Sequence, residues 1–241
     1  MSSESAFTKD NLDLYLKELG KEYRKRSGKK VPAEIILVGG AAILANYGFR
    51  DVTYDIDAII LASSVMKEVI KNVGDRFELP HNWLNADFKK TASFTNKLFE
   101  VSVYYRTFSN ILTVRIIAAE YLIAMKLISG RQYKHDLSDI AGILWEHKKS
   151  GSPILKSAVD KAIAYLYGAD SEIPQVSKEL IEDAFSIDDY EKVYNEIRQN
   201  EKQAKEILLV FQQPNPNGLK GENINDIIEK ARKKKLEEQG N

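Results

Sequence analysis

Two glycines and two carboxylates in one short segment are the residues of this sequence best suited to chemistry. Gly39 and Gly40 follow the apolar run 35–38, and Asp55 and Asp57 stand two residues apart downstream. Glycines let a phosphate approach the backbone closely, and a helix that begins beside them points its free N–H groups at that phosphate. Two carboxylates spaced by two on a strand share one face, and they repel one another unless a cation such as Mg²⁺ joins them.

Neither motif is specific alone, because a Gly-Gly pair is usually a turn and an Asp-x-Asp triplet is usually a solvated strand end. Their combination between apolar strands favours a phosphate-binding site that faces a pair of magnesium-binding carboxylates. Nucleotidyl transfer requires such a site, because the α-phosphorus must be held, its charge neutralised and an acceptor hydroxyl deprotonated. Two metal ions would hold the attacking and leaving oxygens.

Hydrophobic periodicity indicates the elements that would position these residues. The N-terminal half predicts helices over 10–25, 41–47 and 63–73, and strands over 35–38 and 54–61. Two alternating segments, 98–105 and 111–117, predict a hairpin. After residue 118 only helical patterns remain, over 119–129, 137–148, 153–167, 176–185 and 190–211, before a charged tail from 222.

These elements predict an α+β or α/β fold followed by an all-helical C-terminal region. We expect an N-terminal helix within 1–30, a catalytic domain over 31–118, a helical domain over 119–212 and a charged tail or helix over 213–241.

The segment from Leu37 to Ile60 resembles the signature of the DNA polymerase β-like nucleotidyltransferase superfamily, in which hG[GS] and a short helix precede Asp-h-Asp. The run from Arg50 to Asp57 is similar to bacterial groups that include the AbiEii-type toxins, and 79–85 resembles an LPxxWLN segment of an uncharacterised nucleotidyltransferase family. The residues from Glu120 to Asp139 resemble the E-x-L-x-x-x-K…R-x-x-D-x-x-D motif of these groups. The resemblance spans residues 33–145.

The resemblance implies a nucleotidyltransferase fold with a small mixed sheet flanked by helices, and it implies roles for individual residues. Asp55 and Asp57 would bind Mg²⁺ or Mn²⁺ and carry catalysis. The nucleotide would be bound by residues of both motifs, namely Gly39, Gly40, Arg50, Thr53, Lys126, Asp136 and Asp139. For Lys126, the competing interpretation is a side chain that snorkels from an apolar helix to solvent. For Asp136 and Asp139, an ordinary salt-bridge network with Arg131 and Lys134 competes with nucleotide binding.

The sequence departs from the superfamily pattern at two places. A third carboxylate normally lies on a later strand, where this chain offers only Glu100, our candidate for the general base. The second position after hG is Gly40 and not Ser, which removes a hydroxyl that could contact phosphate.

Composition excludes several classes of protein. Equal numbers of basic and acidic residues, 35 each, exclude a generally cationic nucleic-acid coat. The absence of Cys excludes disulfides and thiol nucleophiles, and three scattered His make no obvious metal cluster. The polar start and the short uncharged stretch 35–49 predict a cytoplasmic protein without a membrane partner.

The sequence therefore favours an enzyme that transfers a nucleoside monophosphate from an NTP to a hydroxyl on RNA or tRNA, protein or a small molecule. The resemblance adds the role of a toxin with a cognate antitoxin as partner. Two other functions stay open: a catalytically decayed binding or regulatory protein on the same fold, and an antibiotic-modifying nucleotidyltransferase.

Overall fold

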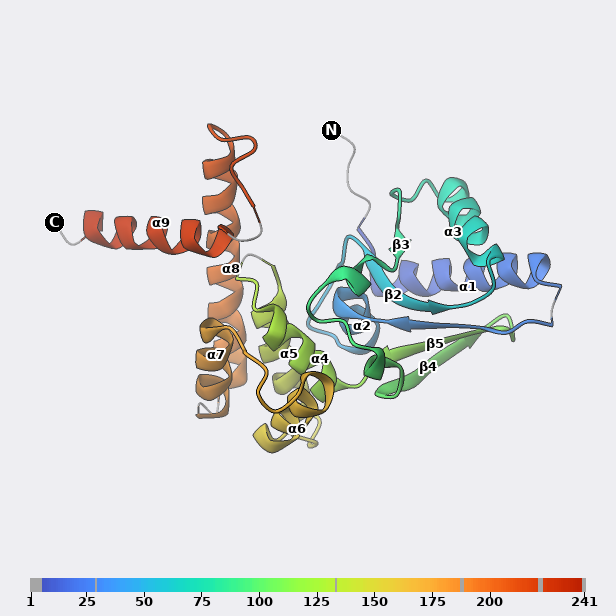
Figure 1. The fold of residues 1–241 in the computed structure, drawn as a ribbon, viewed down its shortest axis with the longest axis horizontal. Helices are drawn as coiled ribbons and strands as arrows, with labels where there is room; N and C mark the ends of the chain where they lie inside the picture. Colours follow the sequence, from blue (N-terminus) through green and yellow to red (C-terminus); the bar gives the residue numbers. More distant parts are fainter. Residues whose placement is uncertain (1–5, 29, 133, 187–188, 221–222, 240–241) are drawn as a thin grey trace. The chain divides into compact units, whose positions relative to one another are not determined.

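Two compact units make up the computed structural model, which describes residues 6–28, 30–132, 134–186, 189–220 and 223–239 (Figure 1). The first unit consists of Met1–Met125 and Leu155–Ser171, and the second of Lys126–Ile154 and Glu172–Asn241.

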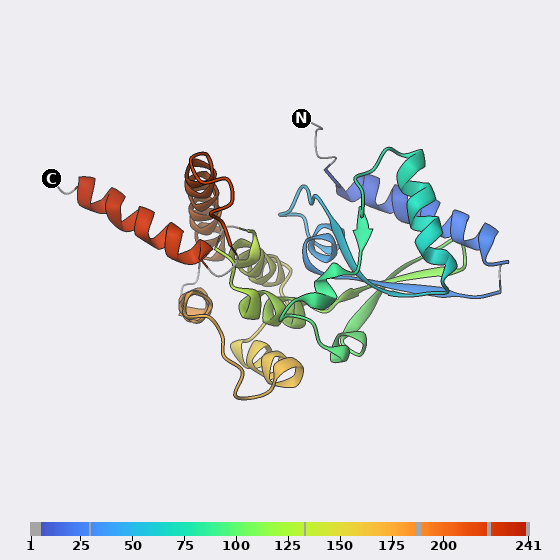
Figure 2. The same cartoon turned by 45° about the horizontal axis from the view of Figure 1, so that its top comes forward.

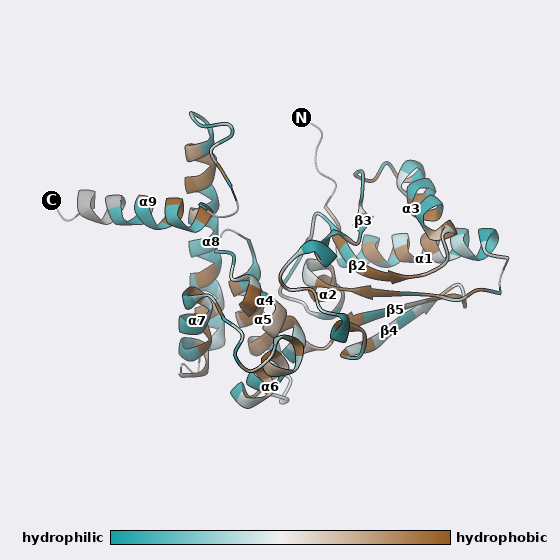
Figure 3. Ribbon diagram, in the orientation of Figure 1, coloured by the Kyte–Doolittle hydropathy of each residue, from teal (hydrophilic) through white to brown (hydrophobic). Residues whose placement is uncertain are grey.

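A five-stranded mixed sheet forms the centre of the first unit. Its strands are β1 (Ala33–Leu37), β2 (Ile56–Leu61), β3 (Leu84–Asn85), β4 (Ser102–Phe108) and β5 (Leu112–Ile117), in the order β3-β2-β1-β5-β4. β1 pairs antiparallel with β2 and parallel with β5, and β4 and β5 form an antiparallel hairpin. Figure 3 shows that β1, the central strand, and its neighbour β2 are hydrophobic along much of their length. The small mixed sheet and the hairpin confirm the predicted fold class.

Helices complete the first unit, and several of them flank the sheet. They are α1 (Lys9–Arg26), α2 (Gly39–Asn46), α3 (Val65–Arg76), the start of α4 (Ala119–Ser129), α6 (Lys156–Tyr167) and the short 3₁₀ helices η1 (Asp87–Lys90) and η2 (Asn96–Phe99). α1 begins at a capping box between Thr8 and Asn11 and buries Leu12, Leu16 and Leu19 on one face. Figure 2 shows α1 and α3 together along one side of the sheet.

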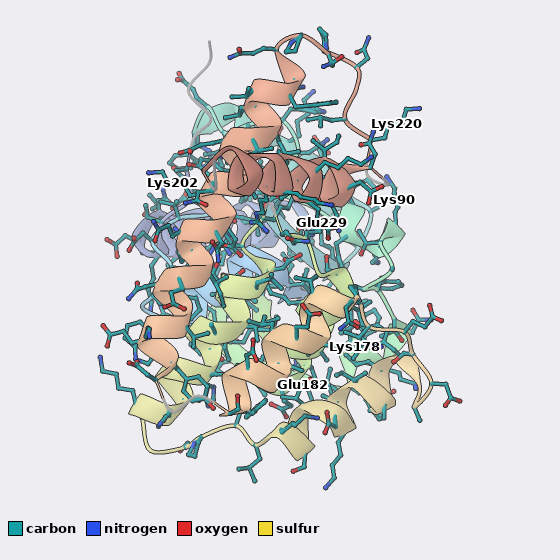
Figure 4. The ribbon with its side chains drawn as sticks, turned by 90° about the vertical axis from the view of Figure 1, so that its left-hand side faces the viewer. Lys90, Lys178, Glu182, Lys202, Lys220 and Glu229 are labelled. Carbon is teal, nitrogen blue, oxygen red and sulfur yellow. The ribbon has the colours of Figure 1, made fainter. Side chains whose placement is uncertain are left out.

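In its described residues the second unit consists of helices and the loops between them, without a strand. It contains the end of α4, then α5 (Asp136–Lys149), α7 (Gln175–Ser186), α8 (Tyr190–Gln212) and α9 (Ile224–Gln239). α5 packs against α8, and α8 packs against α9 around a small core of Ala204, Leu208 and Ile228. Figure 4 shows Lys178 and Glu182 on α7 and Lys202 on α8 among the side chains of the outer faces. Within the described residues, none of the helices combines the length and the apolar character that a membrane span requires.

Several predicted boundaries were wrong, and three of them lie next to candidate site residues. The strand predicted from residue 98 starts at Ser102, because 96–99 form η2, whose N-cap Thr95 accepts a hydrogen bond from the Lys97 N–H. The strand predicted from residue 54 starts at Ile56. The helix predicted from residue 41 starts at Gly39 and so contains both glycines.

Candidate functional site

The two glycines form the first residues of α2, directly after β1. Their N-cap is Val38, whose apolar side chain cannot accept a hydrogen bond from the first N–H groups of the helix. Gly39 has a φ of +55°, a left-handed conformation that favours glycine. The first turn of α2 therefore presents backbone N–H groups and the positive end of the helix dipole.

Asp57 lies beside this helix start. The Val38 N–H donates to the Asp57 carbonyl at 3.0 Å, which joins the end of β1 to the beginning of β2. A Cβ atom at Gly39 would lie 3.9 Å from Asp57 Oδ2. The carboxylate and the first glycine are therefore neighbours, as the sequence motif predicted. Asp57 is partly buried between Ile56 and Ala58, both of which are buried.

Asp55 lies just outside β2 and is exposed. The expectation that Asp55 and Asp57 alternate on one regular strand is therefore corrected. Asp55 belongs to the loop that enters the strand, and its carbonyl accepts a hydrogen bond from Thr53 Oγ1 at 3.2 Å.

Arg50 and Thr53 come together at the second glycine. A Cβ at Gly40 would lie 2.7 Å from Thr53 Oγ1 and 2.8 Å from Arg50 Nη2. Thr53 is 2 % exposed. Arg50 Nε donates to the Val52 carbonyl at 3.1 Å. The hydroxyl and the guanidinium thus occupy the place that a side chain at position 40 would take.

Two further residues lie next to this site, and sequence reasoning missed one of them. Phe7 pairs with Thr53 in an isolated antiparallel bridge, with N–H to O distances of 2.7 and 2.9 Å. Asn85 on β3 is in register with Asp57 on β2, so both side chains stand on the same face of the sheet. The Trp83-Leu84-Asn85 sequence hints at Asn85, whereas no local pattern signals the bridge to Phe7.

Glu100 is placed differently from our expectation. It lies at the C-terminal end of η2, not on a strand, and its carboxylate accepts a hydrogen bond from the Tyr165 hydroxyl. In the described part of the chain, no group of three His, Cys, Asp or Glu side chains could hold a metal ion. The structure therefore does not unite Glu100 with Asp55 and Asp57 as a three-carboxylate site.

Lys126, Asp136 and Asp139 come together in the second unit as a buried ion cluster. Lys126 Nζ lies 2.9 Å from Asp136 Oδ1 and 2.8 Å from Asp139 Oδ2. Arg131 Nε donates to Asp136 Oδ2 at 2.7 Å. Burial alone would raise the pKa of Asp136, but Lys126 and Arg131 outweigh it and hold that pKa well below the usual range. The salt bridge between Asp136 and Arg131 that the sequence left as an alternative is thus present. Lys126 is buried in the same cluster, so the interpretation that it reaches solvent was wrong.

The first-unit residues suit a nucleotide that brings its own metal ion. Mg²⁺ is commonly bound by one or two carboxylates together with substrate phosphates and water, so two aspartates are a sufficient protein contribution. The oxygen donors of Asp55 and Asp57 match this hard cation. The backbone of Gly39 and Gly40 and the Arg50 guanidinium supply donors for phosphate oxygens.

Comparison with known proteins identifies a family to which this chain belongs. A family model described as "Nucleotidyltransferase of unknown function (DUF6036)" matches residues 15–173. The match includes the first-unit residues of the site, apart from Phe7, and the buried ion cluster of the second unit. Neither the search of curated proteins nor the search of solved structures gave a match.

Proposed function

Because the chain belongs to this family of nucleotidyltransferases of unknown function, we propose that it transfers a nucleoside monophosphate from an NTP to a hydroxyl and releases pyrophosphate. The single observation that carries the proposal is the meeting of the Asp57 carboxylate with the first turn of α2, 3.9 Å from a Cβ built at Gly39. That turn favours phosphate, and the carboxylate favours the cation that accompanies phosphate.

Each site residue of the first unit has a distinct role in this proposal. Asp55 and Asp57 would hold Mg²⁺ or Mn²⁺, which neutralises triphosphate charge and polarises the phosphorus under attack. The N–H groups of Gly39 and Gly40 would bind phosphate oxygens. Arg50 would donate to the same phosphates. Thr53 holds the loop, through its bridge to Phe7 and its bond to the Asp55 carbonyl, so that these groups are positioned before the substrate binds.

Labelled NTPs provide the direct test. The protein is incubated with each α-labelled NTP and Mg²⁺ in the presence of total tRNA, cell protein or a panel of aminoglycosides. Labelling of one class identifies the acceptor, and Asp57→Asn should lower the rate at least about a hundredfold, which corresponds to about 3 kcal/mol of transition-state stabilisation. Asp51→Asn, an exposed neighbour outside the site, is the matched control and should retain the wild-type rate. Equal rates for Asp57→Asn and wild type would refute the proposal.

The second candidate is a binding or regulatory protein on this fold. The lack of a three-carboxylate group among the described residues favours it. Calorimetry with each NTP and Mg²⁺ separates the candidates. Nucleotide binding that Asp57→Asn weakens, without pyrophosphate release in any acceptor mixture, would support this second function and exclude the first.

The resemblance to AbiEii-type toxins supports a further proposal, that the acceptor is tRNA or a protein and that an antitoxin partner restrains the activity. Induced expression in bacteria should then arrest growth, whereas expression of the Asp57→Asn variant at the same level should not. Growth that continues with both chains would contradict the toxin role and leave the chemical proposal standing.

A further inference from the structure

A tyrosine hydroxyl of this chain already lies against the carboxylate of Glu100. Tyr165, on α6, donates its hydroxyl hydrogen to Glu100 Oε2. Lys97, which is on η2 beside Glu100, places its Nζ 5.1 Å from the centre of the Tyr165 ring and donates to the Tyr165 carbonyl at 2.5 Å. The Tyr121 ring packs edge-on against Tyr165 at 6.0 Å. The hydroxyl thus contacts a proton acceptor, and a cation lies near the ring that carries it.

This grouping has the chemistry of an acceptor site. A hydroxyl that attacks phosphorus needs a base to take its proton, and a cation near the aromatic ring favours the negative charge of the phenolate. The hydrogen bond to Glu100 raises the pKa of Tyr165, so the phenol keeps its proton at neutral pH until it reacts. Tyr165 is 36 % exposed and therefore accessible to another molecule.

We propose that Tyr165 is a nucleotidyl acceptor of this protein and that Glu100 is the base that takes its proton. The inference rests on the proposed function. The Tyr165 oxygen attacks the α-phosphorus of the NTP, the bond from that phosphorus to the bridging oxygen breaks, and pyrophosphate leaves. The phenolic proton passes to Glu100, and the product is a tyrosyl nucleotide phosphodiester.

The transfer runs between two copies of the chain. Among the described residues Glu100 is not grouped with Asp55 and Asp57 as a metal site, and its carboxylate accepts from the Tyr165 hydroxyl, so the proposal assigns Glu100 to the acceptor. One copy provides Asp57 and the first turn of α2, and the other provides Tyr165 with its base.

Two other tyrosines of the chain are matched controls. Tyr167 lies two positions after Tyr165 on the same helix. Its hydroxyl donates to the Ser93 carbonyl at 2.7 Å, and burial raises the pKa of Tyr167. A carbonyl cannot take a proton as a carboxylate does, so Tyr167 should stay unmodified. Tyr104 on β4 is 62 % exposed and tests whether exposure alone is sufficient for labelling.

The experiment incubates the full chain with each of the four NTPs and Mg²⁺ and maps the modified peptides by mass spectrometry. We expect one nucleotide monophosphate adduct on Tyr165 and none on Tyr104 or Tyr167. Tyr165→Phe should abolish the adduct, Tyr104→Phe should leave it unchanged, and Glu100→Gln should slow its formation about a hundredfold. An adduct confined to another residue, or the same rate for Glu100→Gln as for wild type, would overturn the proposal.

Mixing two variants tests the step between copies. The Asp57→Asn chain keeps the acceptor Tyr165 but lacks a working metal site. The Tyr165→Phe chain keeps the metal site but lacks the acceptor. We expect the mixture to label Tyr165 on the Asp57→Asn chain, whereas either variant alone stays unlabelled. An unlabelled mixture would overturn the intermolecular step.

Failure of this inference is distinguishable from failure of the proposed function. If wild type labels tRNA, cell protein or an aminoglycoside in an Asp57-dependent reaction while Tyr165 carries no adduct, only the acceptor inference falls. If no acceptor and no tyrosine is labelled by any NTP, both fall.

Discussion

Replacing Gly40 by alanine tests how tightly the candidate site is packed. The new Cβ would lie 2.7 Å from Thr53 Oγ1 and 2.8 Å from Arg50 Nη2, well inside a contact distance of about 3.5 Å. The Arg50 side chain is long and can shift, but Thr53 is buried and held on both sides by its bridge to Phe7. Such overpacking costs about 1–3 kcal/mol. Alanine at an open helical position would instead stabilise by up to about 1 kcal/mol over glycine.

We therefore expect Gly40→Ala to lower the free energy of unfolding by about 1 kcal/mol, measured by urea denaturation. A double-mutant cycle assigns the cause. Thr53→Ala removes the crowding group, so it should couple to Gly40→Ala by about 1 kcal/mol, whereas Thr53→Val keeps the bulk and should show little coupling. A Gly40→Ala protein that is more stable than wild type would refute the packing described at this site.

Other predictions follow from the same contacts. Asp136→Asn should cost about 3–5 kcal/mol of unfolding free energy, because it leaves Lys126 buried without its full charge balance. The pKa of Asp136 is lowered in the folded state, so its stabilisation is complete above the pKa of the unfolded carboxyl, about 3.9, and is lost as the pH falls below it. The difference in unfolding free energy between wild type and Asp136→Asn should thus persist at pH 7 and shrink below about pH 4, and a constant difference down to pH 2 would contradict the ion cluster. Gly39→Ala should cost about 1–2 kcal/mol at its φ of +55°, with Gly39→Asn costing less, both read from urea midpoints. Phe7→Ala should cost about 3–5 kcal/mol in the same assay, since Phe7 is fully buried, and a loss below 1 kcal/mol would contradict its packing.

The sequence predicted those parts of the fold that depend on local patterns. The apolar periodicity of 119–129 predicts α4 with the bounds that the structure shows. The β-branched run at 35–38 predicts β1 with an error of two residues at its start, since Ala33 and Glu34 also pair with β2 or β5. In both cases the side chains that define the pattern are the ones that the core buries.

The prediction was wrong where a buried residue mimics a strand. The sequence from Leu98 onward alternates like that of a half-buried strand, and the Leu98 side chain is indeed fully buried. The backbone there instead forms η2, which begins after its N-cap Thr95, and Glu100 is the C-cap of this helix and not part of the sheet. Periodicity over four residues cannot distinguish a 3₁₀ turn from a strand, because both can bury every second or third side chain.

Contacts between residues far apart in the chain were beyond sequence reasoning. Tyr165 meets Glu100 across 65 positions, and Phe7 meets Thr53 across an isolated bridge. A single bridge leaves no hydrophobic period to detect, since only one residue on each side takes part. These two contacts nevertheless decide what Glu100 can do and how firmly the loop before Asp55 is held.

The glycine at position 40 illustrates how such contacts change the interpretation of a motif. The resemblance allows Gly or Ser here, and Gly40 at first indicates the loss of a hydroxyl that could contact phosphate. The structure places Thr53 Oγ1 2.7 Å from the position where a Cβ of residue 40 would stand, so a hydroxyl is present at this place from another part of the chain. A serine at position 40 would compete with Thr53 for the same space. Packing against Thr53 thus explains why Gly and not Ser stands at position 40. This departure from the motif gives no reason to conclude that the phosphate-binding site has lost its function.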